Sequence, residues 1–142
     1  MLSRNYYPFQ MQTTVLLSIK PAFAESIFNG TKAVEFRRVI FKSKDVRKVV
    51  LYASDPVRKV VGEFQIGDVL SMDLDILWTQ TRHQAGIDKN YFYSYFSGRS
   101  VGHAIRIERP RRYNIPLDLE EEFSLARPPQ SFQYVTSGKK ND

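Results

Sequence analysis

Short runs of apolar and β-branched residues, interrupted by turn residues, are the feature that most constrains the fold of this chain. Strand-like runs cover residues 15–20, 33–37, 48–54, 59–66 and 101–107. Helical spacing appears only at residues 22–29 and 86–96. Because helices do not alternate regularly with strands, the pattern favours an α+β fold over a parallel α/β fold. We expect about five or six mostly antiparallel strands, two or three flanking helices, and a sheet curled into a small β-barrel.

The chain length bounds the domain organisation. A chain of 142 residues can bury one continuous core without disulfides or metal. We expect an N-terminal extension at residues 1–14, a single domain at residues 15–135 and a disordered tail at residues 136–142. Prolines 110, 116, 128 and 129 predict an irregular segment after residue 107. Gly62, inside a strand run, predicts a bulge or a close backbone approach.

The residue types present exclude several classes of site. The chain has no cysteine, which excludes disulfides, thiolate metal sites and cysteine nucleophiles. His83 and His103 are the only imidazoles and have no acidic neighbour at ligand spacing, so we expect neither a metal nor a cofactor. No run approaches the roughly 20 apolar residues of a spanning helix. We expect a cytoplasmic protein that does not enter a membrane.

The charge balance points to a polyanionic partner. The net charge is +6, and basic residues cluster in two stretches rather than spreading evenly. The first stretch predicts a nucleic-acid surface made of Arg38, Lys42, Lys44, Arg47, Lys48, Arg58 and Lys59. The second comprises Arg99, Arg106, Arg109, Arg111 and Arg112. The alternative is a solvated face, which is the usual role of such charge runs.

Three charged residues after the first predicted helix carry the candidate chemistry. Glu35 and Arg37 share one face of a predicted strand, and Lys32 lies at or before its start. A carboxylate between two cations stays ionised and oriented, and it leaves cationic donors for a phosphate or a base carbonyl. An ordinary surface row of ion pairs is the alternative.

Further residues are candidate ligand contacts. Ser54 ends a strand and either lines a cleft or makes a turn. Trp78 either stacks on a base or anchors the core, and Tyr91 lies on a helix among core aromatics. Ser131 and Phe132 lie in an extended segment that we expect to help close a cleft.

The segment from Gly30 to Arg37 resembles the G-x-K-x-x-E-x-R signature of the ASCH domain family. The resemblance extends through residues 49–56, 60–64, 86–98 and 102–105, and covers roughly residues 15–135. It implies a PUA-like β-barrel whose cleft is lined by Lys32, Glu35 and Arg37 and binds RNA or modified nucleosides. Family members include an N4-acetylcytidine amidohydrolase and reported ribonucleases. The amidohydrolase type carries threonine at the position of Glu35.

Three functional hypotheses follow. The first is an RNA-binding or modified-nucleoside-binding module, in which Lys32 and Arg37 are cationic contacts and Glu35 accepts a hydrogen bond from a base. The second is a hydrolase acting on RNA or an acylated nucleoside, with Glu35 as base and Lys32 as acid or electrostatic stabiliser. The third is a regulatory interaction protein whose basic surface meets an acidic partner.

Overall fold

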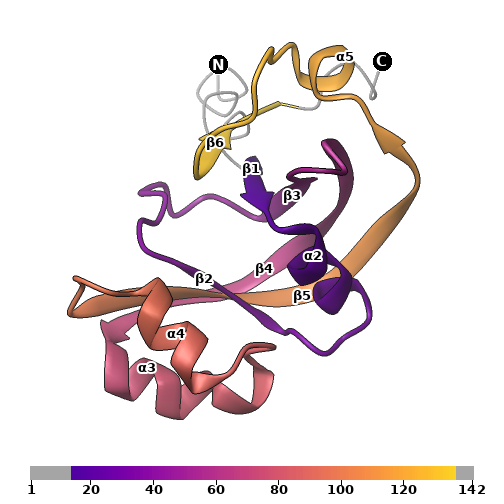
Figure 1. Ribbon diagram of the computed structural model, residues 1–142. Coiled ribbons are helices and arrows are strands. Elements are labelled where there is room, and N and C mark those ends of the chain that lie inside the picture. Colours follow the sequence, from indigo (N-terminus) through magenta and orange to yellow (C-terminus); the bar gives the residue numbers. More distant parts are fainter. Residues whose placement is uncertain (1–13, 137–142) are drawn as a thin grey trace.

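The computed structural model describes residues 14–136, which form one curled sheet with helices packed against it (Figure 1). The elements in chain order are β1 (Thr14–Ile19), α2 (Pro21–Phe28), β2 (Val34–Arg37), β3 (Lys48–Ala53), β4 (Lys59–Asp73), α3 (Leu74–Thr81), the 3₁₀ turn η1 (Arg82–Gln84), α4 (Lys89–Tyr95), β5 (Val101–Leu117), α5 (Leu119–Phe123) and β6 (Phe132–Tyr134). The predicted N-terminal extension and tail fall outside the described residues, except for Thr14 and Thr136.

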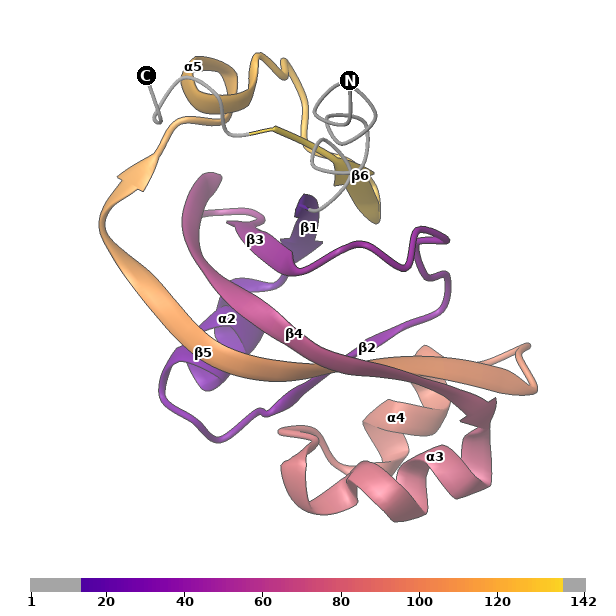
Figure 2. The same cartoon turned by 180° about the vertical axis from the view of Figure 1, so that it is seen from behind.

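The six strands form one sheet in the order β2-β5-β4-β3-β1-β6. Only β1 and β3 pair in parallel, and every other neighbouring pair is antiparallel. The long strands β4 and β5 bend strongly, so the sheet curls into a half-barrel (Figures 1 and 2). The predicted α+β class with a curled, mostly antiparallel sheet is confirmed. The described residues hold four α-helices and one 3₁₀ turn, where we expected two or three helices.

The core follows from the burial of the central strands. β1 and β3 are buried along nearly their whole length and face apolar neighbours on both sides. Helix α2 packs against β3 and β5, whereas α3 packs against β4, β5 and α4 (Figure 1). Helix α2 therefore lies over one part of the sheet and the α3–α4 pair over another. The space between α2 and α4 is where the candidate site lies.

The segment after residue 107 differs from the sequence-based prediction. Strand β5 continues past residue 107 to Leu117, through Pro110 and Pro116. Pro110 and Pro116 lie beyond the residues that pair with β2, and register shifts interrupt the pairing of β5 with β4. Prolines are tolerated at such positions because no ladder hydrogen bond is lost. Residues 69–77 are the end of β4 followed by the start of α3. Asp73 caps this helix, because its side chain accepts a hydrogen bond from the amide of Asp75 at 3.1 Å.

Gly62 allows α2 to pack against the sheet, as its position in a strand predicted. The register of β4 shifts on both sides of it, opposite β3 and opposite β5. A Cβ atom at Gly62 would lie 2.5 Å from the carbonyl oxygen of Arg111 and would clash with the ring of Phe28, the last residue of α2. Backbone and a helix end both occupy the space that a side chain would need.

We expect Gly62→Ala to lower the free energy of unfolding by about 1–3 kcal/mol, because the added methyl group overpacks a closed space. Chemical denaturation followed by circular dichroism measures this. Gly67→Ala is the matched control on the same strand, because its Cβ would meet only the flexible carboxylate of Glu108. Equal stability of the two variants would contradict the packing argument.

Candidate functional site

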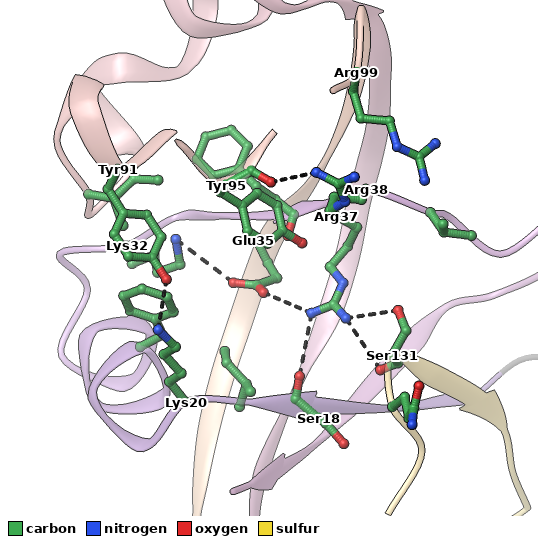
Figure 3. A pocket seen from close by; sticks show the side chains of 16 residues that line it. Ser18, Lys20, Lys32, Glu35, Arg37, Arg38, Tyr91, Tyr95, Arg99 and Ser131 are labelled. Carbon is green, nitrogen blue, oxygen red and sulfur yellow. Dashed lines mark hydrogen bonds and ion pairs between the residues drawn. The ribbon is translucent and has the colours of Figure 1, made fainter. Parts of the chain in front are cut away.

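A pocket of about 430 Å³ lies between β1, α2, β2, α4 and the segment before β6 (Figure 3). Volumes of this order are typical of pockets for small ligands. Residues far apart in the sequence, from Ser18 to Ser131, line it together. The three charged residues of the signature, Lys32, Glu35 and Arg37, all point into it (Figure 3).

The local sequence places these three side chains. Asn29 caps the end of helix α2, and Gly30 follows with φ of +89°, a conformation that favours glycine and turns the chain back. The amide of Lys32 then donates to the carbonyl of Ser26 at 3.0 Å, which holds Lys32 against the end of the helix. Strand β2 begins two residues later, and its alternation puts Glu35 and Arg37 on the same face.

Lys32 is almost fully buried, with only 2% of its surface exposed. Its Nζ donates to the carbonyl of Ala85 at 2.8 Å and lies 3.8 Å from Oε1 of Glu35. The rings of Phe23 and Phe36 also face the ammonium, at 5.0 and 5.2 Å from their centroids. Burial lowers the pKa of Lys32 below its ordinary 10.5, and the negative charge of Glu35 opposes this shift.

Gly86 makes room for the Lys32 side chain. Its φ is +68°, and a Cβ at this position would lie 2.6 Å from Cβ of Lys32. The preceding carbonyl, of Ala85, is the acceptor for the ammonium. The turn at residues 85–86 therefore forms one wall of the lysine site and requires a residue without a side chain.

Arg37 joins the carboxylate to two other segments (Figure 3). Its Nη1 lies 3.2 Å from Oε2 of Glu35 and also donates to the carbonyl of Ser18 at 3.4 Å. Its Nη2 donates to the hydroxyl of Ser131 at 2.9 Å and to the carbonyl of the same residue at 3.4 Å. The Arg37 guanidinium thus connects strand β2 to strand β1 and to the segment before β6.

Glu35 keeps one unused acceptor. Glu35 is 4% exposed, and its Oε1 has no hydrogen-bond partner among the described residues. The nearest cation, Lys32, is at ion-pair rather than hydrogen-bond distance. A buried acceptor without a donor is uncommon in proteins, so this atom is the place in the pocket where a ligand donor is most needed.

Aromatic and basic side chains form the mouth of the pocket. Nζ of Lys20 donates to the Tyr91 hydroxyl at 3.0 Å, and the Tyr91 ring packs edge-on against Phe23. Arg38 donates to the carbonyls of Tyr95 and Ser97 at 2.8 Å, which fixes its guanidinium beside α4. Arg99 also lines the mouth and makes no ion pair with the described residues.

The structure brings together most, but not all, of the predicted ligand contacts. Tyr91 and Ser131 line the pocket with the signature residues. Trp78 does not, because it lies partly buried on α3 and packs against Phe92 of α4. Ser54 also lies outside the pocket, in the turn after β3, where its amide donates to the carbonyl of Ile19. Phe132 packs edge-on against Phe41 at 5.8 Å rather than lining the pocket.

The predicted nucleic-acid surface is divided among several places. Arg38 lines the pocket, whereas Lys42, Lys44 and Arg47 line a second hollow. The three others make ion pairs elsewhere: Lys48 with Glu63, Arg58 with Asp55, and Lys59 with Asp118. The basic run therefore does not form one continuous face.

Sequence reasoning missed several contributors to the pocket, among them Ser18, Lys20, Phe23 and the Ala85–Gly86 turn, and it named Arg99 as basic without assigning it to the cleft. Gly86 carried a usable signal, since an isolated glycine in a turn often supplies a positive φ. Lys20 and Phe23 carried no such signal, because a lysine before a helix and an apolar residue on a helix are common in all proteins. No group of three histidine or acidic residues suited to a metal occurs within residues 14–136, and no helix in that range is long and apolar enough to cross a membrane.

Comparison with known proteins identifies the family. The ASCH domain profile matches residues 17–112, more than half of the chain. This chain belongs to the ASCH domain family. Its resemblance to the family signature, noted from residues 30–37, is thereby confirmed.

Individual relatives of this ASCH domain carry different names. An "ASCH domain-containing ribonuclease" from Zymomonas mobilis is 31% identical over 123 residues, which cover 84% of this chain and 82% of that protein. A protein of Ureaplasma parvum named "Large ribosomal subunit protein uL22" is 28% identical over 86% of this chain, but the match spans only 39% of that protein. The crystal structure of ASCH from Zymomonas mobilis has a TM-score of 0.82 at 25% identity, with 92% of each chain covered.

We expect Glu35→Gln to lower the pKa of Lys32 further, because Glu35 is the group that opposes the effect of burial. A carbon-13 NMR titration of the lysine Cε signals measures this. In the wild type the folded state holds the Lys32 proton less tightly than the unfolded state. The contribution of Lys32 to stability therefore becomes more favourable as the pH rises from the lowered pKa towards 10.5.

Glu63→Gln provides the control for this titration, because Glu63 pairs with Lys48 and Arg111 away from the pocket. An unchanged Lys32 titration in Glu35→Gln would show that the two groups are not coupled.

Proposed function

We propose that this ASCH domain binds single-stranded RNA and takes one nucleotide into the pocket. The observation that carries the proposal is the unpartnered acceptor Oε1 of Glu35, buried beside the Lys32 ammonium in a hollow of about 430 Å³. Every nucleobase presents a hydrogen-bond donor next to an acceptor on its Watson–Crick edge. Such edges are accessible in single strands, where bases are unstacked.

The pocket offers the complementary groups. Glu35 accepts from a ring or exocyclic N–H, while Lys32 uses one of its three donors on Ala85 and has two others for a base acceptor. The Tyr91 ring at the mouth supplies an aromatic face. Arg38 and Arg99 provide positive charge at the entrance, where the phosphate of a bound nucleotide would lie.

We expect Arg99→Ala to weaken binding of a short single-stranded RNA about tenfold and to reduce its dependence on salt, because one phosphate contact is lost. Fluorescence anisotropy with a labelled oligonucleotide over a range of salt concentrations measures both effects. Arg99 makes no ion pair with the described residues, so the melting temperature should not change.

Arg58→Ala is the matched control, since it removes one exposed arginine that lines neither hollow. The proposal is wrong if the wild type binds no RNA, or if both arginine variants bind as it does.

Ribonuclease activity is the second candidate function. The Zymomonas mobilis relative named as an ASCH domain-containing ribonuclease favours it, since that match covers most of both chains. The acid–base pair is the other support: a carboxylate with a free oxygen lies 3.8 Å from a lysine whose pKa is lowered by burial. In this case the pocket holds the ribose and the scissile phosphate rather than a base.

The chemistry would be an internal transesterification. Glu35 takes the proton of the ribose 2′-hydroxyl, and the 2′-oxygen forms a bond to phosphorus. The bond from phosphorus to the 5′-oxygen breaks, and this oxygen takes a proton from the Lys32 ammonium. The products are a 2′,3′-cyclic phosphate and a 5′-hydroxyl end. Arg37 holds the Glu35 carboxylate in place throughout.

If the domain is a ribonuclease, we expect it to cut single-stranded RNA to products with 2′,3′-cyclic phosphate ends. Glu35→Gln should then slow the cleavage at least about 100-fold, because a general base is lost. Electrophoresis and mass spectrometry of the products measure this, with Glu63→Gln as the control. A substrate with 2′-deoxyribose at the cleavage site should survive.

RNA that stays bound and intact after prolonged incubation would leave binding as the function. N4-acetylcytidine belongs in the same assay. Its deacetylation in place of RNA cleavage would show that the pocket hydrolyses an amide of a modified nucleoside instead.

A further inference from the structure

A second hollow, of about 460 Å³, lies between the loop at residues 38–47 and the middle of β4. Ile40, Phe41 and Val46 form its apolar floor together with Ile66 and Val69. The side chains of Lys42, Lys44 and Arg47 and the hydroxyls of Ser43 and Ser71 surround this floor. We call this hollow the basic groove.

The charge of the basic groove is positive and uncompensated. Asp68 is the only acidic residue that lines it within residues 14–136, and its carboxylate already pairs with Nε of Arg106 at 3.1 Å. Lys42, Lys44 and Arg47 make no ion pair with the described residues. Three cations that line one hollow therefore have no ion-pair partner among the described residues.

The guanidinium of Arg47 is held in position by the loop itself. Its Nη1 donates to the carbonyl of Lys44 at 3.1 Å and to that of Val46 at 3.5 Å. Its other donors remain available. Because the side chain is already oriented, binding an anion there costs less conformational entropy than ordering a free arginine.

The basic groove and the pocket share one wall. Arg38 and Val39 line the pocket, and the next two residues, Ile40 and Phe41, line the groove. Val39 is 50% exposed. Residues 38–44 include no acidic side chain, so a polyanion that follows this segment meets no negative charge from it.

We propose that the basic groove binds the sugar–phosphate backbone of the same RNA strand whose neighbouring nucleotide occupies the pocket. The ligand of this domain is then an oligonucleotide rather than a free nucleotide. This inference rests on the proposed binding of RNA in the pocket. Lysines and hydroxyls contact phosphates without reading the base, so the groove contributes affinity and salt dependence but no sequence preference.

The shared wall favours RNA over an acidic peptide as the occupant. A nucleic acid offers one phosphate per nucleotide in a continuous strand, and so it can place a base in the pocket and charges in the groove together. An acidic peptide would match the charge of the groove, but its carboxylates would meet the Glu35 carboxylate in the neighbouring pocket unfavourably. One RNA strand can therefore occupy both hollows, whereas an acidic peptide would occupy the groove alone.

The test compares one nucleotide with a strand in the double variant Lys42→Ala, Lys44→Ala. We expect a fluorescein-labelled single-stranded RNA of about eight nucleotides to bind this variant at least about tenfold more weakly than the wild type. The slope of log affinity against log salt concentration should fall by about 1.4, since each lost phosphate contact contributes about 0.7. Binding of the four nucleoside 5′-monophosphates, followed by NMR shifts of pocket residues, should not change.

The double variant Arg58→Ala, Lys59→Ala is the matched control, because it removes two exposed cations that line neither hollow. If both double variants bind the oligonucleotide as the wild type does while Arg99→Ala weakens it, the groove is not part of the RNA site and the pocket proposal stands. If the wild type binds neither nucleotide nor oligonucleotide, both proposals fail. If the groove variant loses binding of polyglutamate but not of RNA, the groove serves an acidic peptide and our inference is overturned.

Discussion

The interaction on which the site depends is the attachment of Arg37 to Glu35, to β1 and to the segment before β6. A curled half-barrel leaves β2 and β1 unpaired with each other, because β2 pairs only with β5 and β1 pairs with β3 and β6. The Arg37 guanidinium spans this opening through the Ser18 carbonyl and the Ser131 residue. Hydrogen bonds to a permanently charged, planar group are directional, so the opening keeps one shape.

The burial of Lys32 shows what this shape makes possible. A buried ammonium is costly unless it is paired and hydrogen-bonded, and here Glu35, the Ala85 carbonyl and two aromatic rings share that role. Among the described residues, the Ala85 carbonyl is the only hydrogen-bond acceptor of the Lys32 ammonium, and Oε1 of Glu35 has no hydrogen-bond donor. The protein alone therefore leaves the hydrogen bonding of its pocket incomplete, and a donor from outside the protein, a ligand or a water molecule, is needed to complete it.

Much of this arrangement could be predicted from the sequence, and the rest could not for identifiable physical reasons. Strand alternation placed Glu35 and Arg37 on one face, because the period of two is a local property of the chain. The depth of Lys32 and the contact with Gly86 depend on how α4 folds back, which no local pattern encodes. Trp78 illustrates an alternative that the sequence left open: a single tryptophan can be a base platform or a core anchor, and here it lies partly buried on α3 against Phe92 of α4.

Residues beyond the family profile complete the pocket. The profile ends at residue 112, but Ser131 accepts from Arg37 and β6 covers the outer edge of β1. A polypeptide trimmed to the profile would keep every signature residue and lose one wall of the cavity. Possession of the signature by itself is thus a poor guide to ligand competence, and sequence change in the stretch after β5 can alter ligand choice while the signature is preserved.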